Sequence, residues 1–206
     1  MTEIERMNKG LLHCFLDEEM SNLKASAHRI LAKYNNPQTT EEERQSLHRE
    51  LFGDIAGMCI IMPPFTCDYG KFIHLGERCF FNYDCMVLDG CDVQIGNNVF
   101  VGPRTIISAA SHPIYAPTRI ACYGIQKPVV IEDNVWIGAG CIILPGTVIG
   151  ENSIIGAGSV VTGAHPIPKN SIAFGNPCKV QRQITEEDKK KWEGMQEDYL
   201  NSLNNE

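Results

Sequence analysis

An apolar residue recurs at every sixth position through the middle of the chain. Glycine often follows this residue, and a small or β-branched residue often lies four positions after it. The longest run is Ile131, Ile137, Ile143, Ile149, Ile155, Val161 and Ile167. A period of six fits neither the 3.6-residue repeat of an α-helix nor plain alternation along one strand. It fits short strands separated by tight corners. The sequence therefore predicts a mainly β chain coiled as a parallel β-helix, in which each coil covers the next.

The segments on either side of the repeat have a different pattern. Residues 1–53 are predicted to form a helical arm, because apolar residues recur at helical spacing from Met20 to Tyr34 and because Thr40 and Glu43 match a capping box. Residues 54–183 are assigned to the β-helix, with an inserted loop at 112–128 where the period fails. Residues 184–206 are predicted to form a C-terminal helix capped by Thr185. We expect its apolar stripe to pack on the rest of the protein; the stripe is Trp192, Met195, Tyr199 and Leu203.

Composition excludes several classes of partner. The chain has 206 residues and a formal net charge of −7, from 18 Lys+Arg and 25 Asp+Glu. We expect no nucleic-acid partner for so acidic a chain without a basic patch. We also expect no membrane span, because no apolar run reaches the roughly 20 residues that a bilayer requires. The first residues are polar and charged, unlike a signal peptide, so the predicted location is the cytoplasm.

Nine cysteines need an explanation in such a chain. An odd number excludes a complete disulfide framework, and disulfides are not expected in a reducing cytosol. Metal ligation is the alternative, but the sequence contains no CxxC pair, so we expect no metal site. Four cysteines occupy the small position of the repeat, where a free Cys packs as a compact hydrophobe. These four are Cys79, Cys85, Cys91 and Cys141.

His112 lies where the repeat breaks, directly before Pro113. A solenoid must loop out at such a point, and insertions of this kind often carry function. Imidazole is the side chain best suited to acid–base chemistry near neutral pH. A single histidine is more often structural, so the pattern alone leaves both interpretations open.

Several segments resemble the maltose/galactoside O-acetyltransferase group of the hexapeptide-repeat superfamily. The specific ones are Pro64-Phe-Thr-Cys-Asp-Tyr-Gly70, Phe81-Asn-Tyr-Asp-Cys85, Ala110-Ser-His-Pro113 with Arg119, Ile131-Glu-Asp-Asn-Val-Trp-Ile-Gly138, and Gly175-Asn-Pro-Cys178. The resemblance implies a left-handed β-helix and acetyl-CoA-dependent transfer of an acetyl group to a sugar hydroxyl. It also implies a homotrimer whose active sites lie between subunits.

The resemblance also implies roles for individual residues. His112 matches the family's catalytic base, and Asn82 matches an asparagine near the reacting centre, where its amide could donate to the oxyanion or to the acceptor. Asp68 matches an acceptor-binding position. Asparagine also suits tight corners, so a structural role for Asn82 stays open. The positions that match acetyl-CoA contacts are Ala139, Ala157, Thr162, Lys179 and Arg182; the last two could also be ordinary surface charges.

Departures from the family pattern bear on the acceptor. The galactoside enzymes carry an acceptor-binding aspartate where this chain has Gly90, and another near the position of Phe15. Both are missing, which favours a maltose- or glucose-type acceptor over a galactoside. Gly163 replaces a common lysine, and the segment after it is about two residues longer, which affects the expected coenzyme contacts nearby.

Three other interpretations remain. The acceptor could be an antibiotic or serine. A metalloenzyme similar to the γ-class carbonic anhydrases would need three histidines on zinc, but no second histidine follows His112 between Pro113 and Arg119. A non-catalytic solenoid that binds another molecule would present flat arrays of identical outward residues, whereas the outward residues here are mixed.

Overall fold

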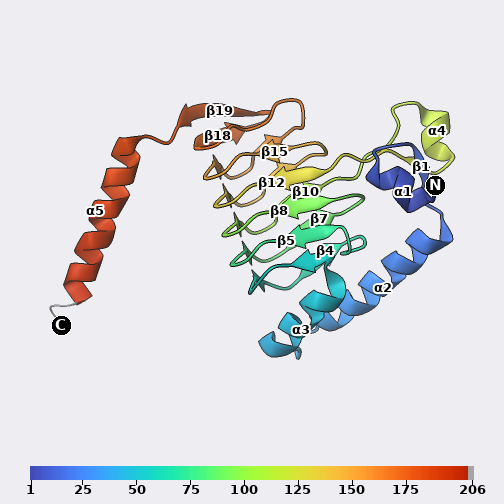
Figure 1. The fold of residues 1–206 in the computed structure, drawn as a ribbon, viewed down its shortest axis with the longest axis horizontal. Coiled ribbons are helices and arrows are strands. Elements are labelled where there is room, and N and C mark those ends of the chain that lie inside the picture. The colour runs from blue at the N-terminus through green and yellow to red at the C-terminus, as the bar shows by residue number, and fades with distance from the viewer. Residues whose placement is uncertain (204–206) are drawn as a thin grey trace.

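The computed structural model, which describes residues 1–203, is a parallel β-solenoid with helical segments at both ends (Figure 1). Its coils form three sheets. Sheet I contains β4 (Phe65–Cys67), β7 (Cys85–Leu88), β10 (Ile106–Ser108), β14 (Ile142–Ile143) and β17 (Val160–Val161). Sheet II contains β2 (Asp54–Ile55), β5 (Ile73–Leu75), β8 (Val93–Ile95), β12 (Val129–Ile131) and β15 (Val148–Ile149). Sheet III contains β3 (Ile60–Ile61), β6 (Phe80–Phe81), β9 (Phe100–Val101), β13 (Trp136–Ile137), β16 (Ile154–Ile155), β18 (Ser171–Gly175) and β19 (Cys178–Gln183).

The apolar residues of the repeat stack on one another inside the solenoid. Ile137 pairs with Ile155 in the next coil, and both are fully buried. The early coils are two residues longer than the later ones, so Leu75 pairs with Ile95. The predicted parallel β-helix is therefore confirmed, and the shift between the two early runs of the repeat reflects coil length.

The four repeat cysteines are buried as predicted, each no more than 3% exposed. Thiols in these small positions reach the next coil: Cys79 Sγ lies 3.0 Å from the Gly96 carbonyl and Cys141 Sγ lies 3.3 Å from that of Gly156. Burial raises the pKa of Cys91 to about 12. These cysteines are therefore neutral packing groups.

A ladder of asparagines forms the edge between sheets II and III. Asn98, Asn134, Asn152 and Asn170 all have left-handed backbone with φ between 56° and 60°. Each donates its side-chain amide to the next, at 2.8–2.9 Å. Asparagine tolerates this conformation better than other residues with a Cβ, and the ladder joins consecutive coils at this edge.

The N-terminal arm contains α1 (Glu3–Asn8), β1 (His13–Cys14), α2 (Glu18–Tyr34) and α3 (Glu41–Leu51). The predicted capping box is present, because Thr40 N–H donates to Glu43 Oε2 at 2.7 Å and Glu43 N–H donates to Thr40 Oγ1 at 3.3 Å. The inserted loop holds α4 (Ala116–Ile120) and β11 (Tyr123–Gly124).

The predicted packing of the C-terminal helix is wrong. Helix α5 (Glu186–Leu203) extends away from the coils, and its stripe residues Trp192, Met195, Tyr199 and Leu203 are 53–64% exposed (Figure 1). The reason lies at the start of the helix. Thr185 caps it by accepting from Asp188 N–H at 3.2 Å, and Asp188 pairs with Arg182 of β19. These bonds direct the helix outward from the last strand. In the chain up to residue 203, no helix combines the length and apolarity that a bilayer crossing requires.

Candidate active site

The predicted site residues lie on two different edges of sheet I. Asn82, Ala139 and Ala157 follow strands of sheet III, so they lie on the edge where sheet III turns into sheet I, here called the III–I edge. Asp68 and His112 follow strands of sheet I and lie where it turns into sheet II, here called the I–II edge. Strands of three or four residues span about 10–13 Å. One chain therefore presents two half-sites separated by a full side of the coil.

Two corners of the III–I edge are bare because they consist of small residues, whereas the corners of the coils below them carry Tyr83 and Arg104. The corners 138–140 and 156–158 read Gly-Ala-Gly, and Ala139 and Ala157 are exposed. Gly140 and Gly158 adopt positive φ, and a Cβ on either would meet nothing within 4 Å. Backbone atoms therefore line these two corners, as an extended ligand with polar groups requires.

Asn82 lies on the same edge, two coils below Ala139. Its Oδ1 accepts from Tyr83 N–H at 2.8 Å. The side-chain carbonyl is thus engaged locally, and the NH2 group is the end that can donate to another molecule. The arrangement suits an amide that stabilises developing negative charge.

Asp68 is held in place by a buried carboxylate. Asp89 is fully buried, and its Oδ1 accepts from the N–H groups of Asp68 and Tyr69 at 3.0 and 2.9 Å. Burial raises the pKa of Asp89 to about 7, although hydrogen bonds from backbone N–H groups oppose that rise. The Asp68 carboxylate itself pairs with Lys24 Nζ of α2 at 2.8 Å. Sequence reasoning did not single out Asp89 or Lys24, because neither shows any periodicity that would place it beside Asp68.

His112 is exposed and contacts the N-terminal arm. Its ring meets the Phe15 ring edge to face, with centroids 5.8 Å apart. Gly90 lies nearby on the same edge: a Cβ there would approach Gln126 to 2.9 Å and the Ala110 methyl group to 3.1 Å. An aspartate at position 90 would therefore require Gln126 to move. In this chain the Gln126 side chain fills the space that the carboxylate would need.

The three remaining predicted coenzyme residues are dispersed. Lys179 is exposed on β19 opposite Phe174, close to where the β18–β19 hairpin turns on the III–I edge. Arg182 lies farther along β19, opposite Ile172, and its guanidinium pairs with Asp188, with the Nη2–Oδ1 contact at 3.0 Å. Thr162 follows β17 and therefore lies on the I–II edge with His112, not beside Ala139 and Ala157.

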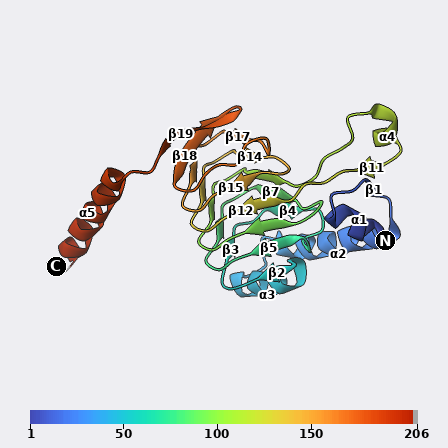
Figure 2. The same cartoon turned by 45° about the horizontal axis from the view of Figure 1, so that its top comes forward.

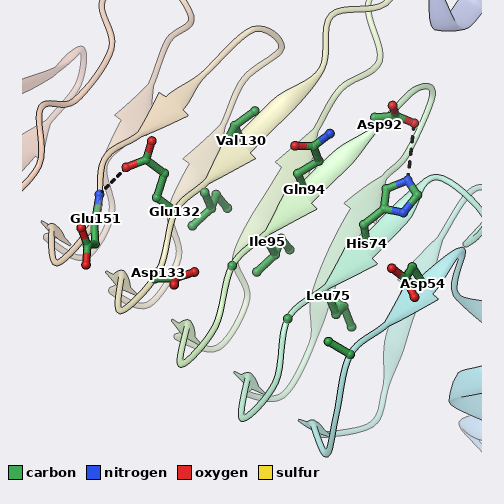
Figure 3. Close-up of a pocket in the computed structure, with 14 residues that line it drawn as sticks. Asp54, His74, Leu75, Asp92, Gln94, Ile95, Val130, Glu132, Asp133 and Glu151 are labelled. Atoms are coloured by element: carbon green, nitrogen blue, oxygen red, sulfur yellow. Dashed lines mark hydrogen bonds and ion pairs between the residues drawn. The ribbon is translucent and has the colours of Figure 1, made fainter.

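A groove of about 810 Å³ lies on the outer face of sheet II (Figure 3). None of the predicted site residues line it. Five carboxylates do: Asp54, Asp92, Glu132, Asp133 and Glu151. This charge would repel the phosphates of a nucleotide coenzyme. Among residues 1–203, no group of three or more His, Cys, Asp or Glu side chains is arranged to hold a metal ion.

Comparison with known proteins agrees with this architecture. The family model described as the maltose acetyltransferase hexapeptide capping motif matches residues 6–57, and the bacterial transferase hexapeptide model matches residues 128–163. The galactoside O-acetyltransferase of Lactococcus lactis subsp. lactis is 40% identical over 86% of this chain and 86% of its own length.

Two solved structures extend the comparison. A maltose O-acetyltransferase from Clostridium difficile 630 superposes with a TM-score of 0.86 at 42% identity, covering 90% of this chain and 98% of that one. A galactoside acetyltransferase in complex with coenzyme A gives a TM-score of 0.87 at 35% identity, covering 92% and 94%. The chain belongs to the maltose/galactoside O-acetyltransferase group of the hexapeptide-repeat family and is an acetyl-CoA-dependent O-acetyltransferase.

Proposed function

We propose that this enzyme acetylates a hydroxyl of a glucose- or maltose-type sugar, with His112 as general base, in an active site shared between two subunits of a homotrimer. The carrying observation is the division of the site residues between two edges of sheet I. The bare corners at Ala139 and Ala157 on the III–I edge suit an extended coenzyme, whereas the I–II edge carries the histidine and the acceptor-binding carboxylate. A second copy that brings its I–II edge against the III–I edge of the first would complete the site.

The proposed reaction is a direct transfer within a ternary complex. His112 takes the proton of the sugar hydroxyl as its oxygen attacks the thioester carbonyl carbon, because an unassisted hydroxyl is a poor nucleophile at neutral pH. The Asn82 amide donates to the oxyanion of the tetrahedral intermediate or to the acceptor. Collapse of the intermediate breaks the carbon–sulfur bond, and the imidazolium returns its proton to the CoA thiolate.

The packing around His112 supports a glucose-type acceptor. Asp68 can accept hydrogen bonds from sugar hydroxyls while its Oδ1 stays paired with Lys24, because a carboxylate accepts several hydrogen bonds at once. A side chain at position 90 would have to displace Gln126, and Phe15 places an apolar ring against His112. The acceptor surface is therefore less acidic than one with aspartates at both positions.

An acceptor screen tests the proposed reaction. Purified enzyme with acetyl-CoA and a thiol-reactive dye should release CoA faster with maltose or glucose than with galactosides. Serine and hydroxyl-bearing antibiotics serve as competing acceptors in the same plate. Preferred turnover of either one, or of a galactoside, would contradict the sugar class proposed here.

Lys179 and Arg182 are proposed to contact the phosphates of the coenzyme, and they should differ in effect. Lys179 is exposed beside the III–I edge, whereas Arg182 is already paired with Asp188. Lys179→Ala should raise the KM for acetyl-CoA roughly three- to tenfold, as expected for one partly solvated charge-assisted bond. Arg182→Ala should raise it less. Steady-state kinetics in which each substrate is varied in turn would show this, and a larger effect on the KM of the sugar would refute the phosphate role.

A further inference from the structure

A buried pair of polar side chains connects the N-terminal arm with the inserted loop. His13 is fully buried and Gln126 is 7% exposed. Strand β1 pairs antiparallel with β11 (Figure 2). In this pairing His13 lies opposite Gly124. Gln126 Nε2 lies 3.4 Å from His13 Nε2. Burial of a polar group costs free energy unless the group is hydrogen-bonded, so each polar atom of these two side chains needs a partner.

The two side chains form a hydrogen-bond chain with only one possible direction. At one end, Ser111 N–H can only donate, and it does so to Gln126 Oε1 at 2.8 Å. At the other end, the Leu11 carbonyl can only accept, and it lies 3.1 Å from His13 Nδ1. His13 must therefore carry its proton on Nδ1 and accept from Gln126 at Nε2. Each step depends on the neutral Nδ1–H imidazole.

This chain ends on the residue directly before His112. The same N-terminal segment also contacts His112 itself, through the ring of Phe15. Phe15 is itself fixed, because its N–H donates to the Cys122 carbonyl in the inserted loop at 3.2 Å. The arm therefore constrains His112 from two sides: the backbone before it through Gln126, and its ring through Phe15.

We propose that His13 and Gln126 are positioning residues that hold the loop of His112 in its catalytic register. The proposal rests on the proposed role of His112 as general base. Neither residue touches the reacting atoms; both act through the Ser111 backbone. Misplacement of a catalytic group by about 1 Å can cost roughly a hundredfold in rate. Loss of this hydrogen-bond chain can therefore lower kcat without changing the affinity for either substrate.

Substitutions at His13 separate position from folding. His13→Leu removes the acceptor for Gln126, and kcat should fall roughly ten- to a hundredfold with the KM for acetyl-CoA within about twofold of the wild type, because the III–I edge is untouched. His13→Gln can offer its Oε1 to Gln126, so it should recover most of the lost kcat. His28 is an exposed histidine on α2, so His28→Leu is the matched control and should leave kcat unchanged.

Gln126→Glu breaks the chain between its two side chains while it keeps the bond to Ser111. A glutamate still accepts from Ser111 but turns a second acceptor toward the His13 lone pair, so the contact with His13 is lost. The kcat of this variant should therefore fall about as far as that of His13→Leu, again with little change in the KM for acetyl-CoA. Nitrogen NMR of His13 in the wild type should show the Nδ1–H tautomer that the hydrogen-bond chain requires.

Equal losses in His13→Leu and His13→Gln, or a Gln126→Glu enzyme with the kcat of the wild type, would overturn the positioning role. So would a His13→Leu enzyme that loses thermal stability but keeps its kcat. Failure of the base assignment is distinct, because it would appear as retained activity in a His112 variant whatever His13 does.

Discussion

Replacement of His112 by alanine or glutamine is expected to reduce kcat by roughly 10²- to 10⁴-fold, the contribution typical of a positioned general base. The side chain is exposed and has one ring contact, with Phe15, so its removal should cost little stability. Acetyl-CoA binding should persist, because the corners of the III–I edge that are proposed to bind the coenzyme contain no part of this residue. Loss of rate without loss of coenzyme affinity is the signature of a group used in the transition state.

Three measurements check this expectation. Turnover is followed with the preferred acceptor of the screen, acetyl-CoA affinity by calorimetry, and folding by the thermal midpoint. Arg119→Ala, in the same inserted loop, controls for general disturbance of the loop, since Arg119 donates to the Pro113 carbonyl at 2.8 Å. An alanine variant at His112 with wild-type kcat would exclude the base assignment and leave proximity as the source of catalysis.

The fold was predictable because the repeat encodes both register and burial. A period of six defines one side of a coil, so Ile137, Ile155 and their equivalents must stack once three sides close. The same logic predicted the burial of Cys79 and Cys141. The prediction from helical periodicity failed for α5, because such periodicity indicates an apolar face but not what packs against it. The direction of α5 depends on the contact between Arg182 and Asp188, a pair of exposed residues that no periodic pattern distinguishes.

The candidate site was predictable in its residue types but not in its arrangement. His112 stood out at the break of the repeat, and the resemblance supplied Asn82 and Asp68. The sequence did not indicate that Asn82 and His112 lie on opposite edges of sheet I, because that separation depends on how many residues form each side of a coil. His13 and Gln126 were missed for a related reason: 113 positions separate them, and only the pairing of β1 with β11 brings them together.

The separation of the two half-sites predicts that two inactive variants should restore each other. A chain with His112→Ala keeps an intact III–I edge, and a chain with Asn82→Ala keeps an intact I–II edge. In the proposed homotrimer, when it contains both chains, an interface between the intact edge of one and the intact edge of the other is a wild-type site. Either composition, two of one chain and one of the other, contains one such interface in three. Mixed trimers should therefore show about one third of the wild-type kcat per trimer.

Co-expression with two different affinity tags and sequential purification isolates these mixed trimers. The control is the same procedure with His112→Ala in both tagged chains, which should stay inactive. A second pairing replaces Asn82→Ala by Ala157→Trp, which fills the bare III–I edge without touching the core, since Ala157 is exposed and the neighbouring Gly158 has open space around it. It should give the same fraction. If each active site were built within one chain, every chain in the mixture would carry a damaged site. No mixture would then be more active than the single variants from which it is made. Recovered activity therefore distinguishes a site shared between subunits from a site built within one chain.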